Sequence, residues 1–242
     1  MKLRSVNGNI QERAEHYTCF TRLPSATQAV TTDLDWDQLG TATLEAPTRP
    51  ANGGAALQTQ TGTEADGDTT YLLNLFPGDL DVNYQPTFEA TVSVEPTTAA
   101  LKPAMWYFGF RDTADVDPAG ESDDAAGFFC QGAAGNAGTD TDGNTVGLVN
   151  WYVHEAHGGT DTYVNTDIPY ELGVDVKLAV RVGDDLKARY YIDDVLVYTG
   201  TAFTSGEVFQ GFAGTELVTA AGNSAKFEVR YVKITQAFTA ST

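Results

Sequence analysis

Cysteine, lysine and long apolar runs are all scarce in this sequence. Its 242 residues include two cysteines, Cys19 and Cys130, and no Cys-x-x-Cys or Cys/His spacing typical of zinc sites. Two free thiols and a single disulfide both fit this pattern. No segment approaches the roughly 20 apolar residues of a membrane-spanning helix. The first residues also lack the apolar stretch of a secretory signal, so we expect none.

Positive charge is scarce as well. The chain carries 14 Lys and Arg against 33 Asp and Glu, a net charge of −19, and only six of its residues are lysines. This balance excludes general binding to nucleic-acid phosphates and attraction to anionic membranes. An acidic, lysine-poor surface keeps a protein soluble by self-repulsion, which strong salt screens. The composition fits a saline habitat, or an acidic extracellular or particle-surface protein.

The charge is unevenly distributed along the chain. Residues 1–32 carry a net charge of +2, so residues 33–242 carry −21. We predict an N-terminal arm over 1–32, with a single helical turn at Asn9–His16, and a separate body over 33–242. An acidic body repels its own copies, which makes the arm a candidate docking segment for a neighbouring chain. The alternatives are a frayed terminus and an arm that completes its own sandwich, with Tyr17–Leu23 as an edge strand. The candidate docking residues are Arg4, Arg13, Tyr17, Phe20 and Arg22.

Period-two patterns dominate the body. Phe88–Glu95 alternates apolar and polar residues, which predicts a half-buried strand. Val174–Val182 alternates in the same way and is followed by the turn residues Gly183–Asp185. A second tight turn, Asp193–Asp194, leads into Val195–Tyr198, so these segments predict a three-stranded meander.

About ten strands are expected, and no run shows a convincing helical period. This pattern predicts an all-β fold, a two-sheet antiparallel jelly-roll sandwich. The last expected strand changes its apolar face part-way, which indicates a β-bulge. The other expected strands are Ala55–Thr61, Thr69–Phe76, Ala104–Arg111, Ala125–Gln131, Val146–Glu155, Val208–Thr215 and Lys226–Gln236.

Catalytic motifs are absent from the sequence. Glycoside hydrolysis needs two carboxylates flanking the scissile bond, and the Glu-x-Asp-x-x-Glu run of concanavalin-like glucanases does not occur. A Gly-x-Ser-x-Gly nucleophile motif is missing too. We therefore predict no catalytic residue, no cofactor and no enzymatic activity.

Three segments hold residue types that bind metals. Asp33, Asp35 and Asp37 form either a calcium site or a solvated acidic face, and the second interpretation is favoured. Asp140–Asn144 resembles an EF-hand loop but lacks the closing glutamate, so we expect a turn. His154 and His157 stand three apart on a strand and would need a turn to share a metal. We predict exposed histidines at a strand end, and no metal ligand.

Aromatic residues gather in Met105–Phe110 and at Trp151–Tyr152. Both faces of the first segment are apolar, which favours a central strand packed on both sides. The alternative is a sugar-stacking platform, since exposed Trp and Tyr rings bind sugar faces.

The hairpin Leu186–Val197 resembles one found in concanavalin A-like (laminin G-like) jelly rolls, with Asp194 in place of the usual glycine. Phe227–Ile234 resembles the closing strand of that fold. More narrowly, Ala104–Asp115 is similar to a stretch in structural proteins on the heads of tailed viruses, and the likeness extends over about residues 33–238. The resemblance implies a non-enzymatic virion protein that decorates the capsid and is assembled in the host cytoplasm. Its implied partners are the major capsid protein, other virion subunits and further copies of this chain.

Two other functions remain open. The first alternative is a carbohydrate-binding adhesion module that recognises host glycans, and the second is a glycan hydrolase. A glycan binder should present a groove with solvent-exposed aromatic residues. A decoration protein should instead bury Trp106 and Trp151.

Overall fold

The computed structural model describes most of the β-structure of the chain. It describes the backbone at residues 2–6, 9–18, 36–40, 44–45, 55–59, 69–74, 80–96, 104–112, 124–131, 150–171, 173–217 and 225–237. Side chains are described within 80–94, 106–112, 124–130, 150–171, 173–214 and 231–237. Within these ranges, no helix is long and apolar enough to cross a membrane.

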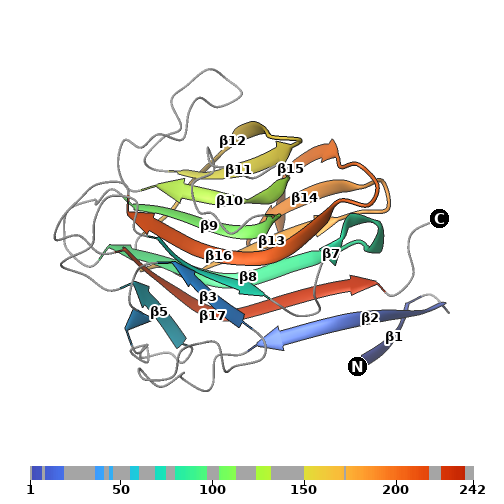
Figure 1. Cartoon of the computed structure of the whole chain (residues 1–242), viewed down its shortest axis with the longest axis horizontal. Coiled ribbons are helices and arrows are strands. Elements are labelled where there is room, and N and C mark those ends of the chain that lie inside the picture. The colour runs from blue at the N-terminus through green and yellow to red at the C-terminus, as the bar shows by residue number, and fades with distance from the viewer. Residues whose placement is uncertain are drawn as a thin grey trace.

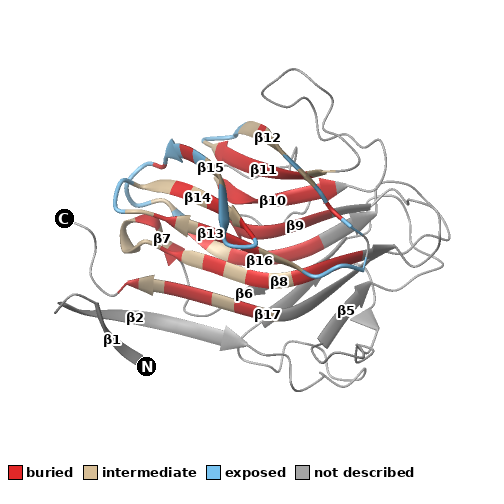
Figure 2. Ribbon diagram, turned by 180° about the vertical axis from the view of Figure 1, so that it is seen from behind, coloured by how far each residue is buried: buried red, intermediate tan, exposed pale blue. Residues whose placement is uncertain are grey.

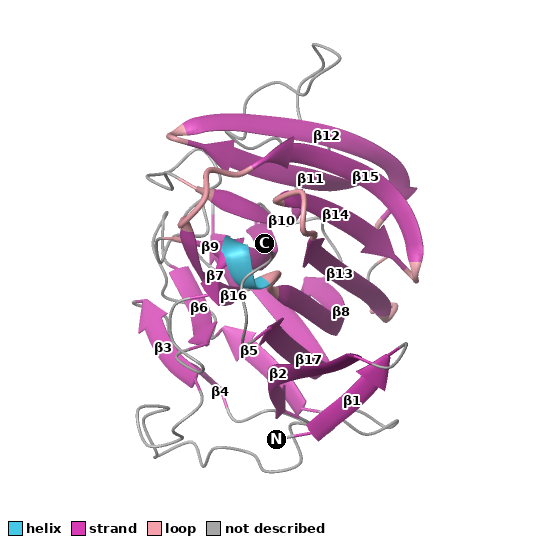
Figure 3. Cartoon of the chain, turned by 90° about the vertical axis from the view of Figure 1, so that its right-hand side faces the viewer, coloured by secondary structure: helices cyan, strands magenta, loops and turns pink. Residues whose placement is uncertain are grey.

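The strands form two antiparallel sheets that pack face to face (Figures 1 and 3). The nine-stranded sheet has the order β1 (Lys2–Val6), β2 (Asn9–Thr18), β17 (Ala225–Ala237), β8 (Thr87–Pro96), β13 (Val176–Val182), β14 (Lys187–Ile192) and β15 (Val195–Ala202). Beside β17 lies β5 (Ala55–Thr59), which also pairs with β4 (Leu44–Glu45).

The eight-stranded sheet has the order β12 (Thr160–Pro169), β11 (Asn150–His157), β10 (Ala125–Gln131), β9 (Ala104–Arg111), β16 (Val208–Leu217), β6 (Thr69–Asn74) and β3 (Trp36–Gly40). The short β7 (Leu80–Asp81) pairs with β16 and leads into a 3₁₀ turn at Val82–Tyr84. The predicted all-β, two-sheet sandwich is confirmed.

The meander predicted from alternation is present as β13, β14 and β15. Asp193 and Asp194 connect the last two strands with φ angles of 49° and 65°, the positive values that a tight hairpin turn requires at both central residues. The strand starts later than expected, at Val176. Val174 is 49 % exposed, so its predicted inward position is wrong.

The bulge predicted in the last strand is also confirmed. The pairing of β17 with β8 shifts register between Val229 and Tyr231. This extra residue moves Val232 and Ile234 onto the buried face.

Strands also form where the sequence did not predict them. Asn9–His16 belongs to β2, so the helical turn expected there is wrong. The polar strand β12 was missed, because residues such as Thr160, Asp161 and Thr162 show no apolar alternation. It forms at the sheet edge by pairing with β11.

Part of the predicted arm lies in the chain's own sheet. β1 and β2 form a hairpin, and β2 pairs with β17 from Thr18 opposite Val232 to Arg13 opposite Ala237. Arg4, Arg13 and Tyr17 therefore stand on strands of this sheet, whereas Phe20 and Arg22 lie outside the described residues. Docking of residues 1–32 on a neighbouring chain stays a prediction.

The core lies between the two sheets, where buried residues alternate along many of the strands (Figure 2). It is rich in aromatic rings. Phe88 of β8 meets Phe110 of β9 edge-on at 5.9 Å, and Phe128 of β10 meets Tyr190 of β14 at 5.7 Å. Cys130 is a free, buried thiol in this core. These contacts cross from one sheet to the other, and removal of their apolar area from water stabilises the sandwich.

Candidate functional site

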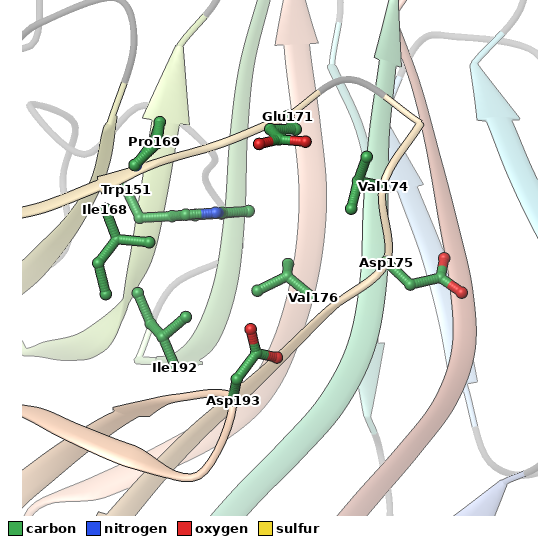
Figure 4. A pocket seen from close by; sticks show the side chains of 9 residues that line it. All are labelled: Trp151, Ile168, Pro169, Glu171, Val174, Asp175, Val176, Ile192 and Asp193. Atoms are coloured by element: carbon green, nitrogen blue, oxygen red, sulfur yellow. The ribbon is translucent and has the colours of Figure 1, made fainter.

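A pocket of about 170 Å³ opens at the edge of the sandwich, where β11 and β12 of one sheet approach β13 and the β14–β15 turn of the other (Figure 4). Its volume equals that of about six waters at about 30 Å³ each, enough for one small polar ligand. Its lining combines apolar groups with carboxylates: Trp151, Ile168, Pro169, Glu171, Val174, Asp175, Val176, Ile192 and Asp193.

Trp151 forms one wall of the pocket. Its indole packs against Phe108 at 6.1 Å and Tyr170 at 6.3 Å between ring centroids, and only 2 % of the residue is exposed. These contacts fix the ring, so the apolar wall is formed before any ligand arrives.

Two carboxylates face each other across the pocket. Figure 4 shows Glu171 on one side and Asp193 on the other, whereas Asp175 points away. Asp193 is held by two bonds to Lys177: its Oδ1 accepts from the Lys177 N–H at 3.0 Å, and its own N–H donates to the Lys177 carbonyl at 2.8 Å. Backbone bonds from Gly173 to Val94 and from Val174 to Glu171 hold the segment that carries Glu171.

Neither Trp106 nor Trp151 forms an exposed stacking platform. Trp106 and Trp151 are buried, and so are Tyr107, Phe108 and Phe110 along β9. The central-strand interpretation of Met105–Phe110 is therefore confirmed over its described side chains.

The histidines lie differently from the prediction. His154 is fully buried; its Nε2 lies 2.9 Å from Asp161 Oδ1, and its ring stacks on Tyr163 at 5.0 Å. His157 is partly buried against Phe203, with ring centroids 4.4 Å apart. Predicting both as exposed was wrong, because the rings of Tyr107 and Tyr163 cover His154 and the ring of Phe203 packs on His157.

Among the described residues, one group could hold a metal ion: Asp124, His157 and Glu207. No sequence motif pointed to it, since the three residues come from distant parts of the chain. The predicted acidic candidate Asp33–Asp35–Asp37 enters the described backbone only at Asp37, in β3, and Asp140–Asn144 lies outside it.

No protein-family model matches the chain, and no curated protein matches it in sequence. Its three-dimensional structure is similar to a protein of unknown function from Shewanella oneidensis MR-1, with a TM-score of 0.63, 12 % identity and coverage of 93 % of this chain and 87 % of that chain. Lectin II from Ulex europaeus matches with a TM-score of 0.53 and 10 % identity, over 92 % of this chain and 98 % of that one.

The fold is a lectin-like, concanavalin A-like jelly roll. A sialidase shares it too, with a TM-score of 0.53 and 10 % identity, over 93 % of this chain but only 19 % of the sialidase. Because these sequence identities are low, the likeness establishes the fold alone. The activity has to be argued from the residues of the candidate site.

Proposed function

We propose that this chain is a carbohydrate-binding module and that the pocket beside Trp151 is its glycan site. The observation that supports the proposal most directly is the pairing of a rigid apolar wall with two opposed carboxylates, Glu171 and Asp193. Carboxylates accept hydrogen bonds from sugar hydroxyls, while the C–H faces of a sugar pack on the accessible apolar side chains Ile168, Val174 and Val176. The lectin fold supports the same interpretation.

The size and position of the pocket limit which glycans can bind. A volume of about 170 Å³ at an open edge suits one sugar residue, such as the end of a glycan chain. The carboxylate lining disfavours anionic sugars, because Glu171 and Asp193 would repel a negatively charged ligand. We therefore expect a neutral glycan or one that carries an amino group.

Glycan-array screening followed by calorimetry with the best ligand tests this proposal. Glu171→Gln and Asp193→Asn should each weaken binding about tenfold, a loss of about 1.4 kcal/mol. Asn at position 193 keeps an oxygen for the Lys177 N–H and tolerates the positive φ. The matched control is Asp184→Asn, in the exposed β13–β14 turn, which should bind like the wild type.

Two outcomes would count against the glycan site. One is a chain that binds no glycan on the array. The other is binding that Glu171→Gln, Asp193→Asn and a pocket-filling Val174→Trp all leave unchanged. Incubation of the bound glycan with the protein, followed by product analysis, tests the prediction that the chain is not an enzyme.

The virion role stays a separate prediction, and the named structural neighbours lend it no support. Burial of Trp106 and Trp151 agrees with the expectation for a decoration protein, but ordinary core packing buries them equally well. Purification of intact particles, followed by immunodetection of this chain, tests both the location and the expected capsid partners.

A further inference from the structure

Asp124, His157 and Glu207 meet at one end of the sandwich. Asp124 directly precedes β10, His157 ends β11, and Glu207 directly precedes β16. Ala125 pairs with Ala156, which places Asp124 opposite His157 across the two strands. The possible ligand atoms of the three side chains all lie within 4.8 Å of one another. The cluster is roughly 20 Å from the Trp151 pocket, since six residues of β11 separate them.

The cluster is held by its surroundings. The Gly158 N–H donates to Asp124 Oδ1 at 3.2 Å, and the His157 ring lies against Phe203 with centroids 4.4 Å apart. The N–H of Glu207 donates to the Thr204 carbonyl at 3.2 Å, which fixes the turn that carries it. All three side chains are partly buried. These hydrogen bonds and this ring contact hold the segments that carry them.

Two polar atoms of the cluster are buried without a hydrogen-bond partner. They are Glu207 Oε2 and His157 Nε2. Nε2 lies 3.6 Å from Oε2 of Glu155, a residue only 2 % exposed, which is too long for a hydrogen bond. A buried polar atom without a partner is destabilising, and coordination of an ion would satisfy both of these atoms.

Negative charge is concentrated around the imidazole. The Glu155 carboxylate lies 3.6 Å from the ring, and ligand atoms of Asp124 and Glu207 lie within 4.8 Å of it. Neither Glu155 nor Glu207 pairs with a lysine or arginine among the side chains that the structure describes. A divalent cation would neutralise the mutual repulsion of these carboxylates.

We propose that Asp124, His157 and Glu207 bind one divalent transition-metal ion, Zn²⁺ or Mn²⁺. An imidazole with carboxylates suits these ions, whereas Ca²⁺ prefers six to eight oxygen ligands. Bonds of about 2.0–2.2 Å place two ligand atoms of one ion up to about 4.3 Å apart. Small side-chain rotations would bring the ligand atoms, now within 4.8 Å of one another, to that distance. Water would complete the coordination.

The bound ion would tie the ends of β10 and β11 to the β15–β16 connection. Glu207 lies on the connection from β15 in the nine-stranded sheet to β16 in the eight-stranded one, while Asp124 and His157 flank β10 and β11. An ion that binds only the folded chain stabilises it by mass action. Zn²⁺ or Mn²⁺ should therefore raise the melting temperature.

Calorimetry on the full-length chain tests the proposal, using untagged protein treated with EDTA and then desalted. We expect one equivalent of Zn²⁺ or Mn²⁺ to bind at least tenfold more tightly than Ca²⁺. Glu207→Gln and Asp124→Asn should each weaken binding at least tenfold. Asp184→Asn removes one exposed acid elsewhere and should bind like the wild type.

A second measurement separates lost binding from lost folding. Glu207→Gln removes a repelled carboxylate and keeps the side-chain shape, so its metal-free melting temperature should equal or exceed that of the wild type. Absence of stoichiometric binding to the wild type overturns the proposal. Equal binding by the wild type, Glu207→Gln and Asp124→Asn also overturns it, since the ion would then lie elsewhere on the acidic surface.

Discussion

Tyr190 of β14 donates a hydrogen bond to Oε1 of Glu155 in β11, at 2.8 Å, across the interior from one sheet to the other. Both residues are buried, and the second oxygen of Glu155 accepts from the Thr201 N–H at 3.2 Å. Burial raises the pKa of Tyr190 well above its usual value, and Glu155 adds to the effect. The phenol therefore stays protonated and remains a donor throughout the ordinary pH range.

Replacement of Tyr190 by Phe should destabilise the chain by about 1.5–3 kcal/mol, because a buried carboxylate oxygen loses its donor. Urea denaturation measures the change. The matched control is Tyr198→Phe: Tyr198 packs near Tyr190 at 5.9 Å, and its hydroxyl makes no hydrogen bond within the described residues. Its effect should stay within about 0.5 kcal/mol. Equal losses in the two variants would contradict this role for the Tyr190 hydroxyl.

Gly127→Ala should destabilise by about 1–3 kcal/mol through overpacking. A Cβ at position 127 would lie 2.4 Å from the Tyr107 ring, which is buried and cannot move aside easily because its hydroxyl donates to the Phe110 carbonyl at 3.1 Å. A double-mutant cycle with Tyr107→Leu provides the check. The Gly127→Ala penalty should shrink when the ring is absent, and an unchanged penalty would refute the clash.

Acid should destabilise the fold through His154. Desolvation lowers the pKa of His154 below its usual 6.5; the Asp161 hydrogen bond and the Glu155 charge oppose this shift, and Arg111 reinforces it. The unfolded chain then binds the proton more readily, so the free energy of unfolding falls as pH drops below about 6.5. The loss per proton is at most about 1.4 kcal/mol per pH unit.

Denaturation of the wild type and of His154→Gln between pH 7.5 and 5 tests this expectation. The wild type should lose more stability on acidification than the variant. The comparison is needed because His157, with a raised pKa, contributes in the opposite direction and loses its stabilising effect as pH rises. If the stabilities of the two proteins fell in parallel with pH, His154 would not be the cause of the loss of stability in acid.

Cys130 should be unreactive in the native protein. Burial raises the pKa of its thiol well above the usual value, which leaves little thiolate to react. In a Cys19→Ser variant, a thiol reagent should modify no cysteine under native conditions and one after denaturation. The denatured wild type, without reductant, should show two thiols, because Cys130 is free. Rapid labelling of the native variant would contradict the burial of Cys130.

Local patterns in the sequence were enough to predict much of the fold. The alternation of Phe88–Glu95, the Asp193–Asp194 turn and the face change near Val232 are each confirmed, because side-chain period and turn chemistry depend on neighbouring residues alone. Composition also predicts no general binding to nucleic-acid phosphates, since net charge is independent of folding. The polar β12 and the strand at Asn9–His16 were not predictable this way, because cross-strand pairing and not an apolar period holds them.

Only the tertiary structure brought the candidate sites together. Trp151, Glu171 and Asp193 line one pocket because strand order places β11 beside the β14–β15 turn across the sandwich. Asp124, His157 and Glu207 are separated by tens of residues and converge through the register of β10 on β11 and the connection to β16. Sequence alone determined that the alternating stretches become strands, because alternation is a local property. Which side chains meet, and which histidine is buried, was decided by long-range pairing and packing, and no local pattern records these.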